Sequence, residues 1–157
     1  MRIGQGIDVH AFSDDPDRAL WLGLVHLPGE RGLAGHSDAD VATHALCDAL
    51  LGAAGLGDLG RHFSDQDEAH RGVSSLRLLE ETLVLVRDAG FRPVSADVTI
   101  IAERPKLAPF MSSMAGALTT VVGTLVSVKA TTTEGLGALG RGEGIGASAV
   151  VLLEEVS

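Results

Sequence analysis

The order of two apolar periodicities along the chain constrains its fold more than any other feature of the sequence. Segments rich in β-branched and apolar residues predict strands at 2–12, 94–102, 124–132 and 147–153. Apolar residues that recur every three or four positions predict helices at 39–53, 74–89 and 110–122. Strands and helices mixed in this order favour an α/β fold of the α+β type, in which helices cover one face of a mixed β-sheet.

The remaining segments are interpreted as connections within a single domain that spans residues 1–157. A short apolar run at 19–28 is interpreted as the returning strand of a hairpin, and the polar stretch 58–72 as a long loop. A glycine-rich segment, 135–146, precedes the last strand. A domain boundary inside 55–72 would leave two halves too small to bury a good core, so a second domain is not expected.

The formal net charge of −9 argues against several classes of partner. Lysine occurs only at Lys106 and Lys129, and the sequence has no basic stripe that would bind nucleic acid or an anionic membrane. No apolar run reaches the ~18 residues of a membrane-spanning helix, and the N-terminus lacks a signal-peptide pattern. Cys47 is the only cysteine, so no intrachain disulfide can form, and we expect a cytoplasmic protein.

One carboxylate and two imidazoles form a candidate metal site. Asp8 and His10 are two residues apart on a predicted strand and therefore share one face. His44 lies on the polar stripe of the first helix, where Asp40 or Asp48 could orient its second ring nitrogen. This ligand set is common for catalytic zinc, which keeps a fourth position open. On spacing alone, ordinary polar residues near a strand end remain the alternative interpretation.

Two other segments have the chemistry of a phosphate site. Ser37 and Asp38 are predicted N-caps of the first helix, whose free N–H groups suit an anion, and His36 precedes them. The segment 129–134 offers hydroxyls and a carboxylate that could hold a diphosphate with its Mg²⁺. The alternatives are a surface loop and a threonine-rich strand end. The loop 58–72 adds three carboxylates that could bind hydroxyls or a hydrated cation, or only keep the loop soluble: Asp58, Asp65 and Asp67.

Several long motifs in a fixed order resemble one enzyme family over nearly the whole chain. They read RIGQGIDVHAF, GHSDADVATHALCDALLGAAGLGDLG, HFSDQD, DVTIIAERPK and VKATTTEGLGALGRGEGI. The chain is identified by these motifs as similar to the 2-C-methyl-D-erythritol 2,4-cyclodiphosphate synthases. The resemblance implies a phosphorus–oxygen lyase of the non-mevalonate isoprenoid pathway. The 2-phosphate of 4-diphosphocytidyl-2-C-methyl-D-erythritol 2-phosphate would attack the β-phosphorus of the same molecule, release CMP and close a cyclic diphosphate.

The resemblance also assigns roles to individual residues. Asp8, His10 and His44 would bind one Zn²⁺ per subunit, and Glu134 would bind Mg²⁺ or Mn²⁺. His36 and Thr132 would stabilise the transition state. The substrate-binding set implied by the family comprises Asp8, Val9, His10, His36, Ser37, Asp58, Leu59, Gly60, Phe63, Ser64, Asp65, Gln66, Asp67, Ala102, Glu103, Arg104, Pro105, Lys106, Leu107, Ala108, Thr131, Thr132, Thr133, Glu134, Ala138 and Arg141.

The family further implies a homotrimer, with sheets toward the threefold axis and active sites between subunits. An isoprenoid diphosphate could bind in an axial cavity, with Arg141 at its mouth. Ala138 and Ser148 depart from the family pattern near this cavity and put that ligand in doubt, while Leu24 replaces a common turn glycine. Two rival functions are a zinc-dependent phosphohydrolase and a non-catalytic trimer that binds isoprenoid diphosphates.

Overall fold

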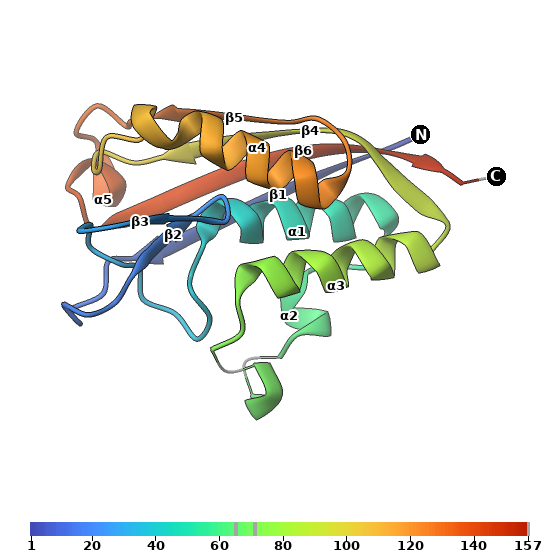
Figure 1. Cartoon of the computed structure of the whole chain (residues 1–157), viewed down its shortest axis with the longest axis horizontal. Coiled ribbons are helices and arrows are strands. Elements are labelled where there is room, and N and C mark those ends of the chain that lie inside the picture. The colour runs from blue at the N-terminus through green and yellow to red at the C-terminus, as the bar shows by residue number, and fades with distance from the viewer. Residues whose placement is uncertain (65, 71, 157) are drawn as a thin grey trace.

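Four strands form one mixed sheet in the computed structural model, which describes residues 1–64, 66–70 and 72–156 (Figure 1). The strands are β1 (Arg2–Ala11), β4 (Phe91–Ile101), β5 (Val126–Thr131) and β6 (Gly144–Glu155), in the order β1-β6-β4-β5. β6 pairs antiparallel with both β1 and β4, and β4 pairs parallel with β5. The predicted mixed sheet is therefore confirmed. The last strand begins earlier than predicted, at Gly144, because this glycine-rich stretch approaches the backbone of β1 closely.

The run at 19–28 was predicted as one returning strand, and this was wrong. It forms its own hairpin from β2 (Leu20–Leu22) and β3 (Val25–Leu27), which pair with each other. Gly23 and Leu24 make the two-residue turn with φ of 55° and 65°, and a tight hairpin turn needs positive φ at both positions. The buried carboxylate of Asp40 accepts both turn N–H groups, at 2.9 and 2.8 Å, which offsets the cost of a leucine in this conformation.

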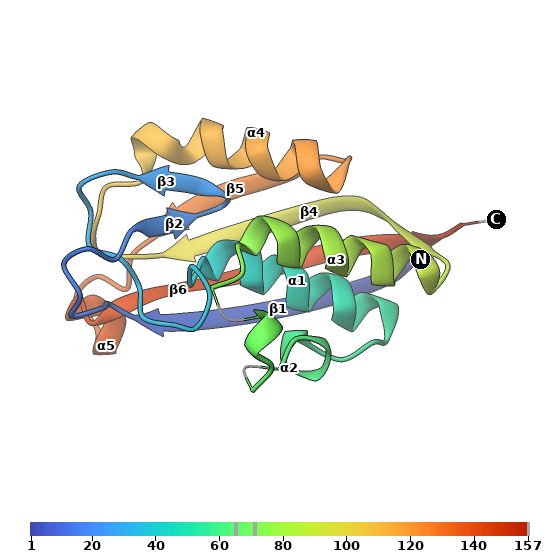
Figure 2. The ribbon, with the colours of Figure 1, turned by 60° about the horizontal axis from the view of Figure 1, so that its bottom comes forward.

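Three long helices cover one face of the sheet: α1 (Val41–Ala54), α3 (Ser75–Asp88) and α4 (Met111–Val122), as Figure 2 shows. α1 lies directly on β1, where a Cβ at Gly4 or Gly6 would come within about 2 Å of α1 backbone oxygens. The lack of side chains at these positions lets strand and helix backbones approach closely. α1 is buried along almost its whole length because α3 packs on its other side.

The opposite face of the sheet has no helical cover among the described residues and is rich in apolar side chains. On β1, Ile3 is 73% exposed, Ile7 60% and Val9 57%, and Val150 on β6 is 41% exposed. In each strand these residues alternate with buried ones. Gln5 on β1 and the Asp97–Lys129 pair on β4 and β5 are polar, so the apolar part of this face is centred on β1, and exposed apolar side chains of this kind are typical of a surface that contacts another protein chain.

Asp40 caps the first helix, whereas Ser37 and Asp38 were predicted to do so. Its carboxylate accepts the N–H of Thr43 at 3.0 Å, and α1 begins at Val41. Short helical turns occupy stretches that the sequence presented as loops: α2 (Leu59–His62), η1 (Glu68–His70), η2 (Ala108–Phe110) and α5 (Gly137–Gly140).

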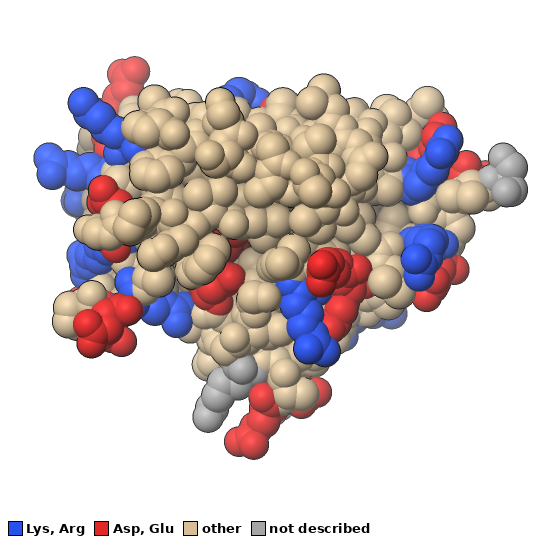
Figure 3. Space-filling view, viewed as in Figure 1, with Lys and Arg blue, Asp and Glu red and all other residues tan. Residues whose placement is uncertain are grey.

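Charged side chains avoid the part of the surface formed by α4, which contains no Lys, Arg, Asp or Glu (Figure 3). On the face shown in Figure 3, the basic side chains are scattered at the edges and do not form a stripe. The longest helices have 14 residues, and within the described part of the chain none is long and apolar enough to cross a membrane.

Candidate metal centre and substrate pocket

The structure brings Asp8, His10 and His44 together at one end of β1 and α1. Asp8 Oδ2 lies 3.1 Å from His10 Nε2 and 3.2 Å from His44 Nδ1, and one ligand atom of each residue lies within 4.8 Å of the others. Asp8 and His10 point toward α1 because they alternate with the outward Ile7 and Val9. The predicted convergence of these three groups is confirmed.

Hydrogen bonds determine which nitrogen of each imidazole faces the centre. His10 Nδ1 lies 2.6 Å from the carbonyl oxygen of Ala34, which can only accept, so Nδ1 carries the proton and Nε2 faces Asp8 with a lone pair. His44 Nε2 lies 2.9 Å from Ser75 Oγ and 3.3 Å from Ser37 Oγ, which leaves Nδ1 toward Asp8.

The predicted partners of His44, Asp40 or Asp48, were wrong. Asp40 caps α1 and holds the β2–β3 turn, and Asp48 accepts the N–H of Leu59 at 2.8 Å. The ring nitrogens of His44 contact Asp8, Ser37 and Ser75 instead. The sequence offered no signal for Ser75, which is 31 residues from His44 and becomes its neighbour only when α3 packs on α1.

The electrostatics of the centre favour a bound cation. Burial raises the pKa of Asp8, but the hydrogen bonds that the protonated imidazoles of His10 and His44 can donate to it outweigh burial and hold that pKa at about 2. The hydrogen bond to Asp8 raises the pKa of His10 above its usual value, against the opposing effect of burial. Three electron-pair donors thus face one point, which demands a proton or a metal ion. One carboxylate and two neutral imidazoles suit zinc and similar divalent ions.

A pocket of about 220 Å³ opens beside this centre. Of the predicted residues, it is lined by His10, His36, Ser37, His44, Leu59, Gly60 and Phe63. The sequence interpretation missed Gly35, His70, Val73 and Leu78, which also line it. Only Leu78 carried a signal, its place on the apolar stripe of the helix that begins at 74. The pocket is therefore lined both by apolar side chains, such as Phe63, Val73 and Leu78, and by the polar groups of the metal centre.

Several polar side chains of the segment 58–72 accept hydrogen bonds from nearby backbone N–H groups of the same segment. Asp58 caps α2 by accepting the N–H of Arg61 at 3.0 Å, and Asp67 accepts the N–H of Ala69 at 3.0 Å. Ser64 Oγ accepts the N–H of Gln66 at 3.2 Å. Asp65, a predicted substrate contact, lies outside the described residues.

The segments 102–108 and 131–134 lie next to each other at the ends of β4 and β5. Glu103 connects them, since its Oε1 accepts the N–H of Thr133 at 3.0 Å and that of Gly135 at 3.2 Å. Glu134 has φ of 52° and an exposed side chain, and its N–H is held by Thr132 Oγ1 at 3.1 Å. Ala138 belongs to α5, and Arg141 follows it and pairs with Glu143 at 2.6 Å.

One chain does not bring these two segments to its own metal centre. β1 and β5 are opposite edges of the sheet, three strand spacings or about 14 Å apart. In the sheet register, Thr131 of β5 pairs with Ile101 of β4, and Ile101 pairs with Gly146 of β6. Gly146 in turn pairs with Val9 of β1, whose side chain lies on the open face. Asp8 and His10 lie on the helix face. The candidate residues thus fall into two separate groups, one at β1 and one after β4 and β5.

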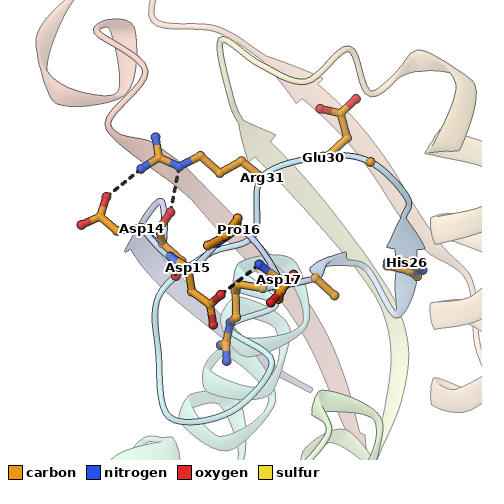
Figure 4. A pocket seen from close by; sticks show the side chains of 11 residues that line it. Asp14, Asp15, Pro16, Asp17, His26, Glu30 and Arg31 are labelled. Carbon is orange, nitrogen blue, oxygen red and sulfur yellow. Dashed lines mark hydrogen bonds and ion pairs between the residues drawn. The ribbon is translucent and has the colours of Figure 1, made fainter.

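A second hollow, of about 710 Å³, contains none of the predicted site residues (Figure 4). It lies between the segments 13–19 and 26–31, and most of its labelled side chains are acidic. Arg31 spans its rim, where Nη2 lies 3.1 Å from Asp14 Oδ1 and Nε donates to the carbonyl of Ser13 at 2.8 Å. Of its charged groups, Arg31 and Asp14 form an ion pair, and Arg18 donates to the backbone carbonyl of Leu33 at 2.8 Å.

Comparisons with known proteins agree with this geometry. The sequence model of the YgbB family matches residues 1–154. The chain is 56% identical over 156 residues to the 2-C-methyl-D-erythritol 2,4-cyclodiphosphate synthase of Syntrophobacter fumaroxidans, covering 98% of this chain and 97% of the relative. A solved synthase of this kind with CDP bound is 36% identical with a TM-score of 0.88, over 98% of this chain and 100% of that one. The bifunctional IspDF from Campylobacter jejuni is 38% identical with a TM-score of 0.93, over 99% of this chain and 42% of that longer chain.

Proposed function

The chain belongs to the YgbB family, and from this membership we propose that it is a 2-C-methyl-D-erythritol 2,4-cyclodiphosphate synthase of the non-mevalonate isoprenoid pathway. It converts 4-diphosphocytidyl-2-C-methyl-D-erythritol 2-phosphate into the cyclic diphosphate and CMP. The observation that carries the proposal is the convergence of Asp8, His10 and His44 in a chain that matches such synthases along nearly its full length.

The substrate supplies its own nucleophile, so the enzyme needs to position groups and neutralise charge. A 2-phosphate oxygen forms a bond to the β-phosphorus while the bond from that phosphorus to CMP breaks. Asp8 Oδ2, His10 Nε2 and His44 Nδ1 hold zinc, which when bound orients phosphate oxygens and acts as a Lewis acid. Glu134, with its exposed carboxylate, holds Mg²⁺ or Mn²⁺ at the diphosphate. Catalysis of this kind rests on proximity and electrostatic stabilisation.

The pocket beside the metal centre receives the methylerythritol unit. Its apolar side chains suit the methyl group, and the hydroxyl of Ser37, whose oxygen accepts the N–H of Ala39 at 3.2 Å, can donate its proton to the 2-phosphate. His36 lies at the same rim and faces the transferring phosphates together with Thr132. Val9, whose side chain is on the open face, contributes only its backbone. The segment 102–108 binds the cytidine.

The two separated groups of residues favour a homotrimer in which each active site lies between subunits. One subunit provides the metal centre and its pocket, and its neighbour provides 102–108 and 131–134. The exposed apolar face of β1 and β6 supports packing of the sheets around a threefold axis. An isoprenoid diphosphate beside Arg141 in an axial cavity stays a prediction.

Product analysis tests the proposed reaction against both rivals. Purified protein with Zn²⁺, Mg²⁺ and the substrate is incubated in H₂¹⁸O, and the products are identified by ³¹P NMR and mass spectrometry. The synthase releases CMP and a cyclic diphosphate without ¹⁸O, because no water takes part. A phosphohydrolase would give an open product that contains ¹⁸O, and a non-catalytic trimer would leave the substrate intact. Glu134→Gln serves as the matched control, with strongly reduced turnover expected.

A further inference from the structure

The hydroxyl of Ser75 lies between the side chains of Asp38 and His44. It contacts the carboxylate of Asp38 and lies 2.9 Å from His44 Nε2. Ser75 is fully buried, His44 is only 8% exposed and Asp38 is half-buried, so the Ser75–His44 bond in particular is shielded from water. The three groups come from different places: the segment before α1, the first turn of α3, and α1 itself.

The direction of each hydrogen bond follows from the donors available. Asp38 Oδ2 accepts the N–H of Ser75 at 2.8 Å, and Oδ1 accepts the N–H of Asp40 at 3.2 Å. A carboxylate engaged in this way only accepts, so the Ser75 hydroxyl donates its one proton to Asp38. The oxygen of that hydroxyl is left with lone pairs toward His44, and Nε2 of His44 must therefore carry the imidazole proton.

We infer that Asp38 and Ser75 are positioning residues that select the Nε2–H tautomer of His44. In this tautomer Nδ1 has its lone pair free and directed at Asp8, as a metal ligand requires. In the other tautomer a proton would occupy that position. Partners that orient a ligating imidazole in this way raise metal affinity about 10–100-fold. This inference rests on the proposed function only in that Asp8, His10 and His44 bind a metal ion.

Replacement of Asp38 by asparagine gives the sharpest test, because it changes one group without changing its size. The shorter backbone bond, from Ser75 N, keeps the amide oxygen at the Oδ2 position and places the NH₂ group opposite Ser75 Oγ. That group donates to the hydroxyl, which must then donate to His44 Nε2. Asp38→Asn is thus expected to reverse the direction of the hydrogen bonds and to put the proton on Nδ1. Ser75→Ala removes the acceptor without reversing the direction.

The experiment uses the full-length protein, uniformly labelled with ¹⁵N at histidine. In the metal-free state, the ¹⁵N shifts and long-range couplings of His44 identify its tautomer. Zinc affinity is measured separately by competition with a chromogenic chelator. The matched control is Ser74→Ala, the neighbouring residue, whose hydroxyl caps α3 by accepting the N–H of Arg77 at 3.3 Å and does not contact His44.

The expected results are Nε2–H in the wild type and in Ser74→Ala, and Nδ1–H in Asp38→Asn. Zinc affinity should fall about 10–100-fold in Asp38→Asn and Ser75→Ala, and stay within a few-fold of wild type in Ser74→Ala. An Nδ1–H tautomer in the wild type, or wild-type zinc affinity in both variants, would overturn the inference. If Asp38→Asn does not fold, the zinc affinity of Ser75→Ala alone tests the inference. The tautomer is read without substrate, so these results stand apart from failure to form the cyclic product.

Discussion

Complementation between two inactive chains tests whether each active site is shared by two subunits. One chain carries Asp8→Asn, which damages the metal centre and leaves 131–134 intact. The other carries Glu134→Gln, which removes the carboxylate proposed to bind the second metal ion and leaves the Asp8, His10 and His44 centre intact. Both chains are produced together with different affinity tags, and two successive purifications isolate the trimers that contain both.

The separation of the two groups of residues determines the expected activity. Asp8 and His10 lie on β1 and Glu134 follows β5, the opposite edge of the sheet, so in the proposed homotrimer a complete site takes one part from each of two neighbours. A closed ring of three has three interfaces. Whether it contains two Asp8→Asn chains and one Glu134→Gln chain or the reverse, only one interface joins an intact metal centre to an intact Glu134. Every mixed trimer should therefore show about one third of wild-type activity.

CMP release per trimer is the measurement, with doubly tagged wild type as the reference. The two homotrimeric variants are the controls and should show little turnover. Mixed trimers that are as inactive as these controls would mean that each chain builds its site alone, contrary to the sheet order. The ratio of the two chains can be checked independently by zinc content, because the mixed trimers should retain zinc only in the chains that keep Asp8.

Three further predictions concern packing, thiol chemistry and protonation. Gly6→Ala should cost about 3 kcal/mol in chemical denaturation, since its Cβ would lie 2.0 Å from a backbone oxygen of α1, whereas Gly116→Ala on exposed α4 meets nothing within 4 Å and should be neutral or slightly stabilising. Cys47 should resist alkylation in the native protein and react only after unfolding, because burial raises the pKa of its thiol. Zinc affinity, measured by chelator competition across a pH series, should rise with pH through the raised pKa of His10 and then level off. Asp8, with a pKa of about 2, is already ionised over this range. An affinity that does not depend on pH would contradict this.

The sequence by itself determined the elements of the fold and the nature of the metal ligands. Helical and strand periodicities are local, so the helices at 74–89 and 110–122 and the four main strands could be located from spacing alone. The two-residue spacing of Asp8 and His10 placed both on one face for the same reason. The roles of 102–108 and of 131–134 came from resemblance to a family, since no local pattern distinguishes them from a strand end and a turn.

Only the tertiary structure decided which residues meet across long separations. Ser75 reaches His44, and Asp38 reaches Ser75, because α3 packs on α1, and Asp40 turns to the β2–β3 hairpin instead of the metal centre. The strand order likewise put β1 and β5 at opposite edges, which divides the candidate site into two separate groups. Contacts of this kind depend on how separate elements pack, and the amphipathic pattern of one segment carries no information about its partner.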